Sequence, residues 1–153
     1  MAIEIVERPA FTVVGMSIRT KPMSPDIPAL WPKFVARLPE IPGRTEPAVS
    51  YGVMQHEPPD ALFYMAGVAV LAPARAPQGL ESREIPAGGY AQFRYPLSRL
   101  GEGFGEIFNR LLPSSGYVQG PGFLLERYGE SFDPGDASSV VEILIPVRPR
   151  LMG

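Results

Sequence analysis

Runs of apolar and β-branched residues alternate along the whole chain with clusters of proline, glycine and other turn-forming residues. Apolar runs of this length are typical of β-strands, whereas apolar residues spaced three and four positions apart are typical of helices. The helical pattern predicts helices at residues 28–38 and 101–112. The strand pattern predicts strands at residues 3–18 (one strand, or two separated near Arg8-Pro9), 48–55, 62–71, 82–95, 123–128 and 140–147.

The predicted elements occur twice in the same order: strand, helix, strand, strand. The motif Glu7-Arg8-Pro9-Ala10 opens the first half, and Glu84-Ile85-Pro86-Ala87 opens the second half 77 positions later. The same offset aligns two further pairs of residues, and an offset of 73 aligns the two helices. The aligned pairs are Tyr51 with Tyr128, Met65 with Glu142, and Trp31 with Phe104.

A repeated βαββ unit predicts an α+β fold, in which an antiparallel sheet carries two helices and the two halves meet at a central groove. We expect one domain over residues 1–153, with pseudo-repeats at about residues 1–75 and 78–150.

One acidic residue interrupts the most apolar of the predicted strands. Glu142 stands between two valines and Ile143-Leu144-Ile145. A lone carboxylate in apolar surroundings is costly unless it is paired, protonated or given a cationic partner. Glu142 is therefore a candidate for a functional site.

Composition and charge argue against nucleic-acid binding and against contact with a membrane. The chain has 153 residues, a net charge of −2, no cysteine and no basic stripe, so we expect no direct contact with nucleic acid. Neither a signal-peptide pattern nor an apolar run of membrane-spanning length occurs, so a cytoplasmic protein with no membrane contact is expected.

The residues offer little for a metal or a cofactor, and we expect neither. His56 is the one histidine, and it is expected at the surface of a loop without a second ligand at metal spacing. The Ala87-Gly88-Gly89 segment precedes a predicted strand and not a helix, so it does not resemble a phosphate-binding loop.

Several short segments follow one another along the chain in a specific order and spacing: Glu7–Met16, the Trp31 helix, Leu62–Val70, Ile85–Arg94, Leu112–Tyr117, Phe123–Tyr128 and Val141–Val147. Taken in this order, they resemble the family of GyrI-like small-molecule-binding domains, which also form the effector-binding domain of AraC-type and MerR-type multidrug regulators. Where that family often has a histidine and a glycine before the second helix, this chain has Tyr95-Pro96-Leu97. No helix-turn-helix segment accompanies the resemblance.

The resemblance implies a central aromatic pocket with an acidic floor. By the match of the strands, the floor acids would be Glu126 and Glu142, close enough to influence each other's protonation. Solvated carboxylates, or ion pairs with Arg94 or Arg127, would account for the same pattern. The other candidate lining residues are Trp31, Tyr51, Tyr64, Met65, Phe104, Tyr128 and Leu144.

The leading hypothesis is a stand-alone protein that captures amphipathic or lipophilic organic molecules, cations among them. The alternative is a hydrolase of strained, cyclopropane-type natural products, with Glu126 or Glu142 as general base and Tyr51, Tyr64 or Tyr128 as hydrogen-bond donor. A third hypothesis is a protein-interaction role, such as restraining a topoisomerase, for which the residues supply no specific support.

Overall fold

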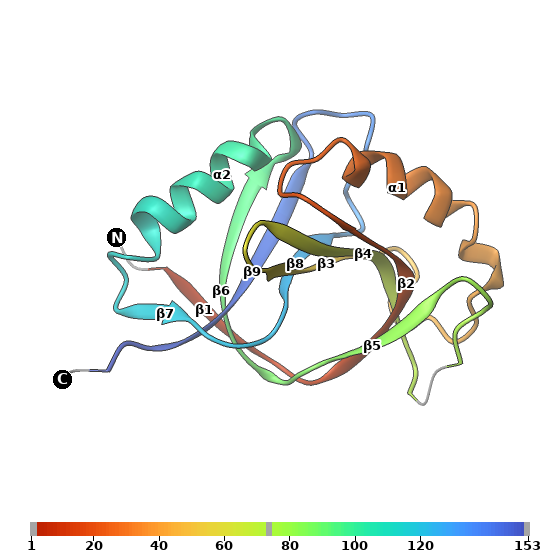
Figure 1. Cartoon of the computed structure of the whole chain (residues 1–153), viewed down its shortest axis with the longest axis horizontal. Coiled ribbons are helices and arrows are strands. Elements are labelled where there is room, and N and C mark those ends of the chain that lie inside the picture. The colour runs from red at the N-terminus through yellow and green to blue at the C-terminus, as the bar shows by residue number, and fades with distance from the viewer. Residues whose placement is uncertain (1–2, 73–74, 152–153) are drawn as a thin grey trace.

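The computed structural model describes residues 3–72 and 75–151. Its elements are a nine-stranded sheet and two helices (Figure 1). The helices are α1 (Asp26–Val35) and α2 (Leu100–Glu106), with short helical turns η1 (Leu38–Glu40), η2 (Leu97–Arg99) and η3 (Ile107–Leu111), the last of which continues α2 as a π-helix. The strands are β1 (Glu4–Arg8), β2 (Phe11–Thr20), β3 (Ser50–Glu57), β4 (Ala61–Val70), β5 (Glu81–Ile85), β6 (Gly88–Pro96), β7 (Tyr117–Gln119), β8 (Leu124–Tyr128) and β9 (Val140–Pro149).

The sheet is antiparallel and has the order β1-β6-β9-β8-β3-β4-β2-β5, with β7 added on β9. Strands β8 and β3 form the central pair, and β1 and β5 form the two ends. Each end strand pairs with a strand of the other half, β1 with β6 and β5 with β2. The predicted α+β fold, an antiparallel sheet with two helices, is confirmed.

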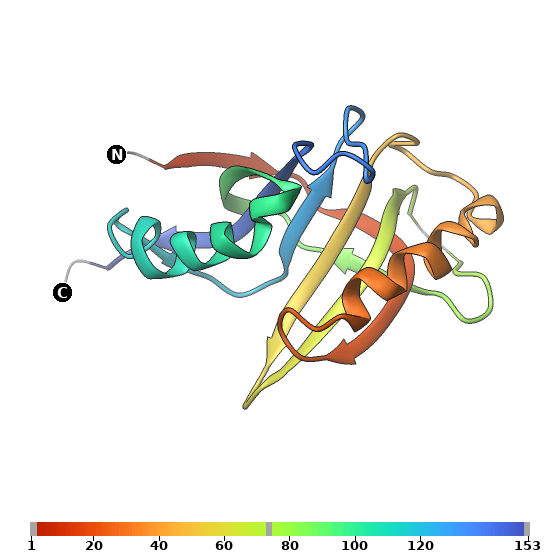
Figure 2. The same ribbon diagram turned by 90° about the horizontal axis from the view of Figure 1, so that it is seen from above.

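Both helices lie on the same face of the sheet, on either side of the central strands (Figures 1 and 2). Residues on a strand point alternately to its two faces, so the sheet has two separate cores. The core under the helices contains Phe34 and Ile107 from the helical segments, together with Tyr64 and Ile143 from the strands. The core on the opposite face contains Tyr51, Met65, Leu125 and Leu144.

Gly103 of α2 has a packing reason. A Cβ atom on Gly103 would lie 2.6 Å from the ring of Tyr95, so only glycine lets this helix approach β6 so closely. Glycine weakens a helix by roughly 1 kcal/mol relative to alanine, and here the close packing offsets that cost. Neither α1 nor α2, nor any other helix of the described part of the chain, is long and apolar enough to cross a membrane.

Candidate functional site

A cavity of about 1650 Å³ lies between the two helices, above the central strands β3, β4 and β8. It exceeds the roughly 300–1,000 Å³ that is usual for small-molecule sites, so it has room for a bulky organic molecule. Its lining is mostly apolar and aromatic. The aromatic lining residues are Trp31 on α1, Tyr64 on β4, Phe104 on α2, Phe108 on η3, Tyr128 on β8, and Phe132.

Glu126 of β8 supplies the only carboxylate among the described residues that line this cavity, and no lysine or arginine is among them. The residue is only 5% exposed. Its Oε1 atom accepts hydrogen bonds from the hydroxyl of Tyr64 at 2.7 Å and from the hydroxyl of Tyr128 at 2.9 Å. A negative charge on Glu126 would therefore have two hydrogen-bond donors but no lysine or arginine among the described residues of the cavity wall.

The hydrogen bonds have a fixed direction. The indole Nε1 of Trp31 can only donate, and it donates to the Tyr64 hydroxyl at 3.0 Å. Tyr64 accepts this bond, so its own proton is directed to Glu126. A chain of donors thus runs from α1 through β4 to the carboxylate on β8.

Burial raises the pKa of Glu126 above its ordinary value, and the hydrogen bonds from Tyr64 and Tyr128 partly oppose this rise. Burial, followed by the neighbouring carboxylate charge, raises the pKa of both tyrosines well above the ordinary value. Both hydroxyls therefore stay protonated and act as donors, while Glu126 is the group that exchanges a proton.

Three aromatic rings of the cavity lining contact one another beside the carboxylate. The rings of Trp31 and Tyr128 meet edge to face at 5.2 Å between centroids, and Tyr128 meets Phe132 in the same manner at 4.7 Å. Such edge-to-face contacts help to hold the rings in place. The sequence pattern did not single out Phe132, because it lies in a turn-rich segment between strands.

Gly52 makes room for the carboxylate, and the sequence pattern did not single it out either. It lies directly opposite Glu126 in the β3–β8 pair. A Cβ atom on Gly52 would be 2.5 Å from Glu126 Oε1 and 2.5 Å from the Tyr64 hydroxyl oxygen. A glycine inside a predicted strand is the available signal, because it often marks such a close approach.

The structure brings some of the predicted site residues together and separates the rest. Trp31, Tyr64, Phe104, Glu126 and Tyr128 all line the cavity. Tyr51, Met65, Glu142 and Leu144 do not line it and lie on the opposite face of the sheet.

The prediction that Glu126 and Glu142 share one groove is wrong. In the β8–β9 pair, Glu126 stands opposite Ile143, whereas Arg127 stands opposite Glu142. Neighbouring residues on a strand point to opposite faces, so the two carboxylates lie on opposite sides of the sheet. Glu142 instead pairs with Arg127 at 2.9 Å and with Arg94 at 3.2 Å.

The 77-residue offset misplaced Tyr51 for the same reason. An odd offset between β3 and β8 equates residues of opposite faces, so Tyr51 is not the counterpart of Tyr128. The Tyr51 side chain is fully buried, donates to Glu46 at 2.8 Å and accepts from Arg8 at 2.9 Å. Met65 and Leu144 are fully buried in the same opposite core.

His56 lies in a strand and not, as the sequence pattern predicted, in a loop. Strand β3 continues through it to Glu57, and His56 lines the cavity while its side chain stays exposed. Within residues 3–72 and 75–151, no three His, Asp or Glu side chains are grouped as a metal ion would require.

We expect Glu142→Gln to lower the free energy of unfolding by about 1–2 kcal/mol, because it leaves the half-buried Arg127 without its closest charged partner. Urea unfolding measures this change. The matched control is Glu102→Gln, which breaks the well-exposed pair with Arg99 and should cost less than about 0.5 kcal/mol. Equal losses in the two variants would contradict a structural role for Glu142.

Comparison with known proteins identifies the family to which the chain belongs. The model of the family described as GyrI-like small molecule binding domain matches residues 1–148. The transcriptional regulator BrlR of Pseudomonas aeruginosa is 35% identical over 150 residues, which is 96% of this chain and 56% of BrlR. The chain thus spans about half the length of this curated relative.

Solved structures agree with the fold. A putative bacterial transcription regulation protein from Staphylococcus aureus has a TM-score of 0.73 at 16% identity, over 97% of this chain and 99% of that one. The structure of SAV2435 bound to tetraphenylphosphonium has a TM-score of 0.75 at 15% identity, over 97% of this chain and 94% of that one. The chain belongs to the family of GyrI-like small-molecule-binding domains.

Proposed function

We propose that this domain binds bulky, lipophilic organic cations in the cavity between its helices, with Glu126 as the counter-charge. The observation that carries the proposal is a carboxylate that is only 5% exposed in an aromatic cavity whose described lining contains no lysine or arginine. The faces of aromatic rings attract cations, and this attraction is stronger where water is excluded. The tetraphenylphosphonium bound to the structural neighbour is a ligand of this class.

The geometry around Glu126 prepares it to receive a cation. Tyr64 and Tyr128 both donate to Oε1, and these two bonds leave Oε2 for the ligand. The two donors hold the carboxylate in place before binding, so less side-chain freedom is lost when the ligand arrives. A neutral or anionic molecule of the same shape would gain the aromatic contacts but would lack the charge interaction.

The pKa of Glu126 sets the expected dependence on pH. Because burial raises this pKa, part of the unliganded protein carries a neutral Glu126 at acidic pH, and a cation binds only after a proton leaves. Affinity for tetraphenylphosphonium should therefore rise with pH through the raised pKa and level off above it. Quenching of Trp31, the one tryptophan of the chain, measures the affinity at each pH.

Stability of the unliganded protein should change in the opposite direction. The folded state holds the Glu126 proton more tightly than the unfolded state, so stability falls as pH rises from the ordinary pKa to the raised one. Glu126→Gln should remove both the rise in affinity and this part of the fall in stability. A pH dependence that survives in Glu126→Gln would contradict the assignment to this residue.

One observation favours hydrolysis as a second candidate function. A carboxylate with a raised pKa and two protonated tyrosines meet at one point of a large cavity, and these groups would serve as general base and hydrogen-bond donors towards a strained electrophile. Glu142 has no part in this, because it lies on the other face. Product formation from a cyclopropane-containing electrophile, lost in Glu126→Gln, would support hydrolysis, whereas binding without product would exclude it.

A further inference from the structure

A strained residue stands at the edge of the cavity. Residues 21–24 form a turn closed by a hydrogen bond from Ser24 N to the Lys21 carbonyl at 3.1 Å, with Pro22 second and Met23 third. Met23 has a φ of +62°, which suits a type II turn but normally requires glycine at this position. In the described part of the chain, every other residue with positive φ is a glycine: Gly43, Gly79, Gly116 and Gly122.

The conformation of the turn does not explain why residue 23 is a methionine and not a glycine. The left-handed conformation costs a side-chain-bearing residue roughly 1–2 kcal/mol, and glycine would avoid this cost. The Met23 side chain is also 72% exposed, so burial in a core does not repay it. A strained residue that persists without a structural gain points to a role at a functional site.

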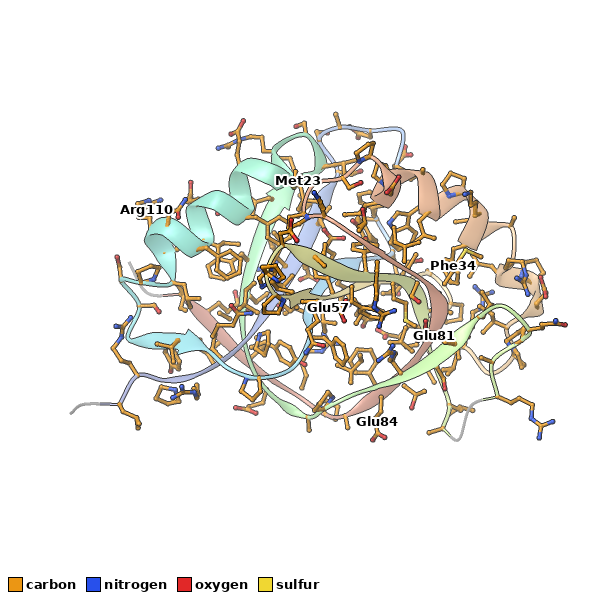
Figure 3. All side chains as sticks on the ribbon, viewed as in Figure 1. Met23, Phe34, Glu57, Glu81, Glu84 and Arg110 are labelled. Carbon is orange, nitrogen blue, oxygen red and sulfur yellow. The ribbon has the colours of Figure 1, made fainter. Side chains whose placement is uncertain are left out.

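The end of the Met23 side chain lies against the second half of the molecule. Its terminal carbon, Cε, lies 2.8 Å from the position that a Cβ atom on Gly101 would occupy. Met23 precedes α1 and Gly101 is in α2, and both residues line the cavity. Figure 3 shows Met23 between the two helices, above the strands.

We propose that Met23 is a specificity-determining residue of the cavity, which closes over the outer side of a bound ligand and controls its exchange. The inference rests on the proposed function and adds the residue that selects ligands by size and aromatic surface. A thioether is flexible and polarisable and makes favourable contacts with aromatic rings, so it suits a polyaromatic cation. Gly101 completes the closure, because any larger residue there would displace the end of Met23.

Stopped-flow measurement of Trp31 fluorescence with tetraphenylphosphonium tests this inference. We expect Met23→Gly to raise the dissociation rate roughly three- to tenfold, since it removes a thioether–aromatic contact and opens the mouth. Its unfolding transition should not fall, because the strain at φ +62° is relieved. A small cation, tetramethylammonium, should show no change between Met23→Gly and the parent.

Gly101→Ala gives the same test without altering the turn. The added Cβ pushes aside only the flexible end of Met23, so dissociation should again accelerate while the protein remains folded. Gly105→Ala is the matched control in the same helix, because its Cβ would meet only Asn109 at 4.0 Å. It should leave both rate constants unchanged.

The possible results of these measurements distinguish a failure of the Met23 role from a failure of the proposed function. If the parent binds the phosphonium in a Glu126-dependent manner but Met23→Gly and Gly101→Ala exchange it at the parental rate, the role of Met23 is overturned alone. If the parent does not bind the phosphonium at all, both the proposed function and the role of Met23 are overturned.

Discussion

Glu126→Gln should weaken the binding of tetraphenylphosphonium by roughly 30- to 300-fold, or about 2–3.4 kcal/mol. The amide is nearly the same size as the carboxylate and still accepts hydrogen bonds from Tyr64 and Tyr128, so the cavity keeps its shape. What is lost is the charge, which acts in a site that is shielded from water. Isothermal titration calorimetry at a pH above the raised pKa of Glu126 measures the difference.

The same substitution should not destabilise the unliganded protein. Burial raises the pKa of Glu126 because the charged form is disfavoured in the folded state, and glutamine removes that cost. Affinity should therefore fall while the free energy of unfolding is unchanged or higher. A Glu126→Gln variant that binds the phosphonium as well as the parent would show that the ring contacts alone hold the ligand.

Gly52→Ala should have the second largest effect, and it should act on both stability and binding. The new methyl group would lie 2.5 Å from Glu126 Oε1 and 2.5 Å from the Tyr64 hydroxyl oxygen, so the carboxylate and its donor must move. We expect a loss of about 1–3 kcal/mol in the free energy of unfolding, as for other overpacked sites. Affinity for the phosphonium should fall at least about tenfold, since the loss of alignment resembles the loss of one charged hydrogen bond.

Gly88→Ala is the matched control for this prediction. Gly88 also lies in a strand, but a Cβ atom there would meet nothing within 4 Å. The control should bind as the parent does and should be at least as stable, because alanine loses less backbone entropy on folding. Similar losses in Gly52→Ala and Gly88→Ala would mean that the close approach to Glu126 is not the cause.

The arrangement of elements could be predicted because it depends on local pattern. The apolar runs located most of the strands, and the spacing around Trp31 and Phe104 located the two helices that wall the cavity. Residues 82–95, predicted as one strand, form two: β5 pairs with β2, and β6 pairs with β1 and β9. The short strand β7 was not predicted, since a three-residue strand carries too little apolar pattern to stand out.

The site was predicted less completely, because it depends on strand register. Glu126 and Glu142 have similar apolar neighbours in sequence, yet the register of β8 against β9 places them on opposite faces. Likewise, Gly52 and Met23 matter through contacts with distant segments, Glu126 in one case and Gly101 in the other. A single sequence records the residue types but not these long-range approaches.

The role of Glu126 as a counter-charge is measured most directly by comparing two ligands of nearly the same shape and opposite charge. Tetraphenylphosphonium and tetraphenylborate present equivalent aromatic surfaces to the walls formed by Trp31, Tyr128 and Phe132. Calorimetry measures the affinity of the protein for each ion. If Glu126 is the counter-charge of a cation site, the phosphonium should bind at least about 100-fold more tightly than the borate. In Glu126→Gln this preference should largely disappear. Equal binding of the two ions by the parent, or an unchanged preference in Glu126→Gln, would show that Glu126 is not the counter-charge of a cation site.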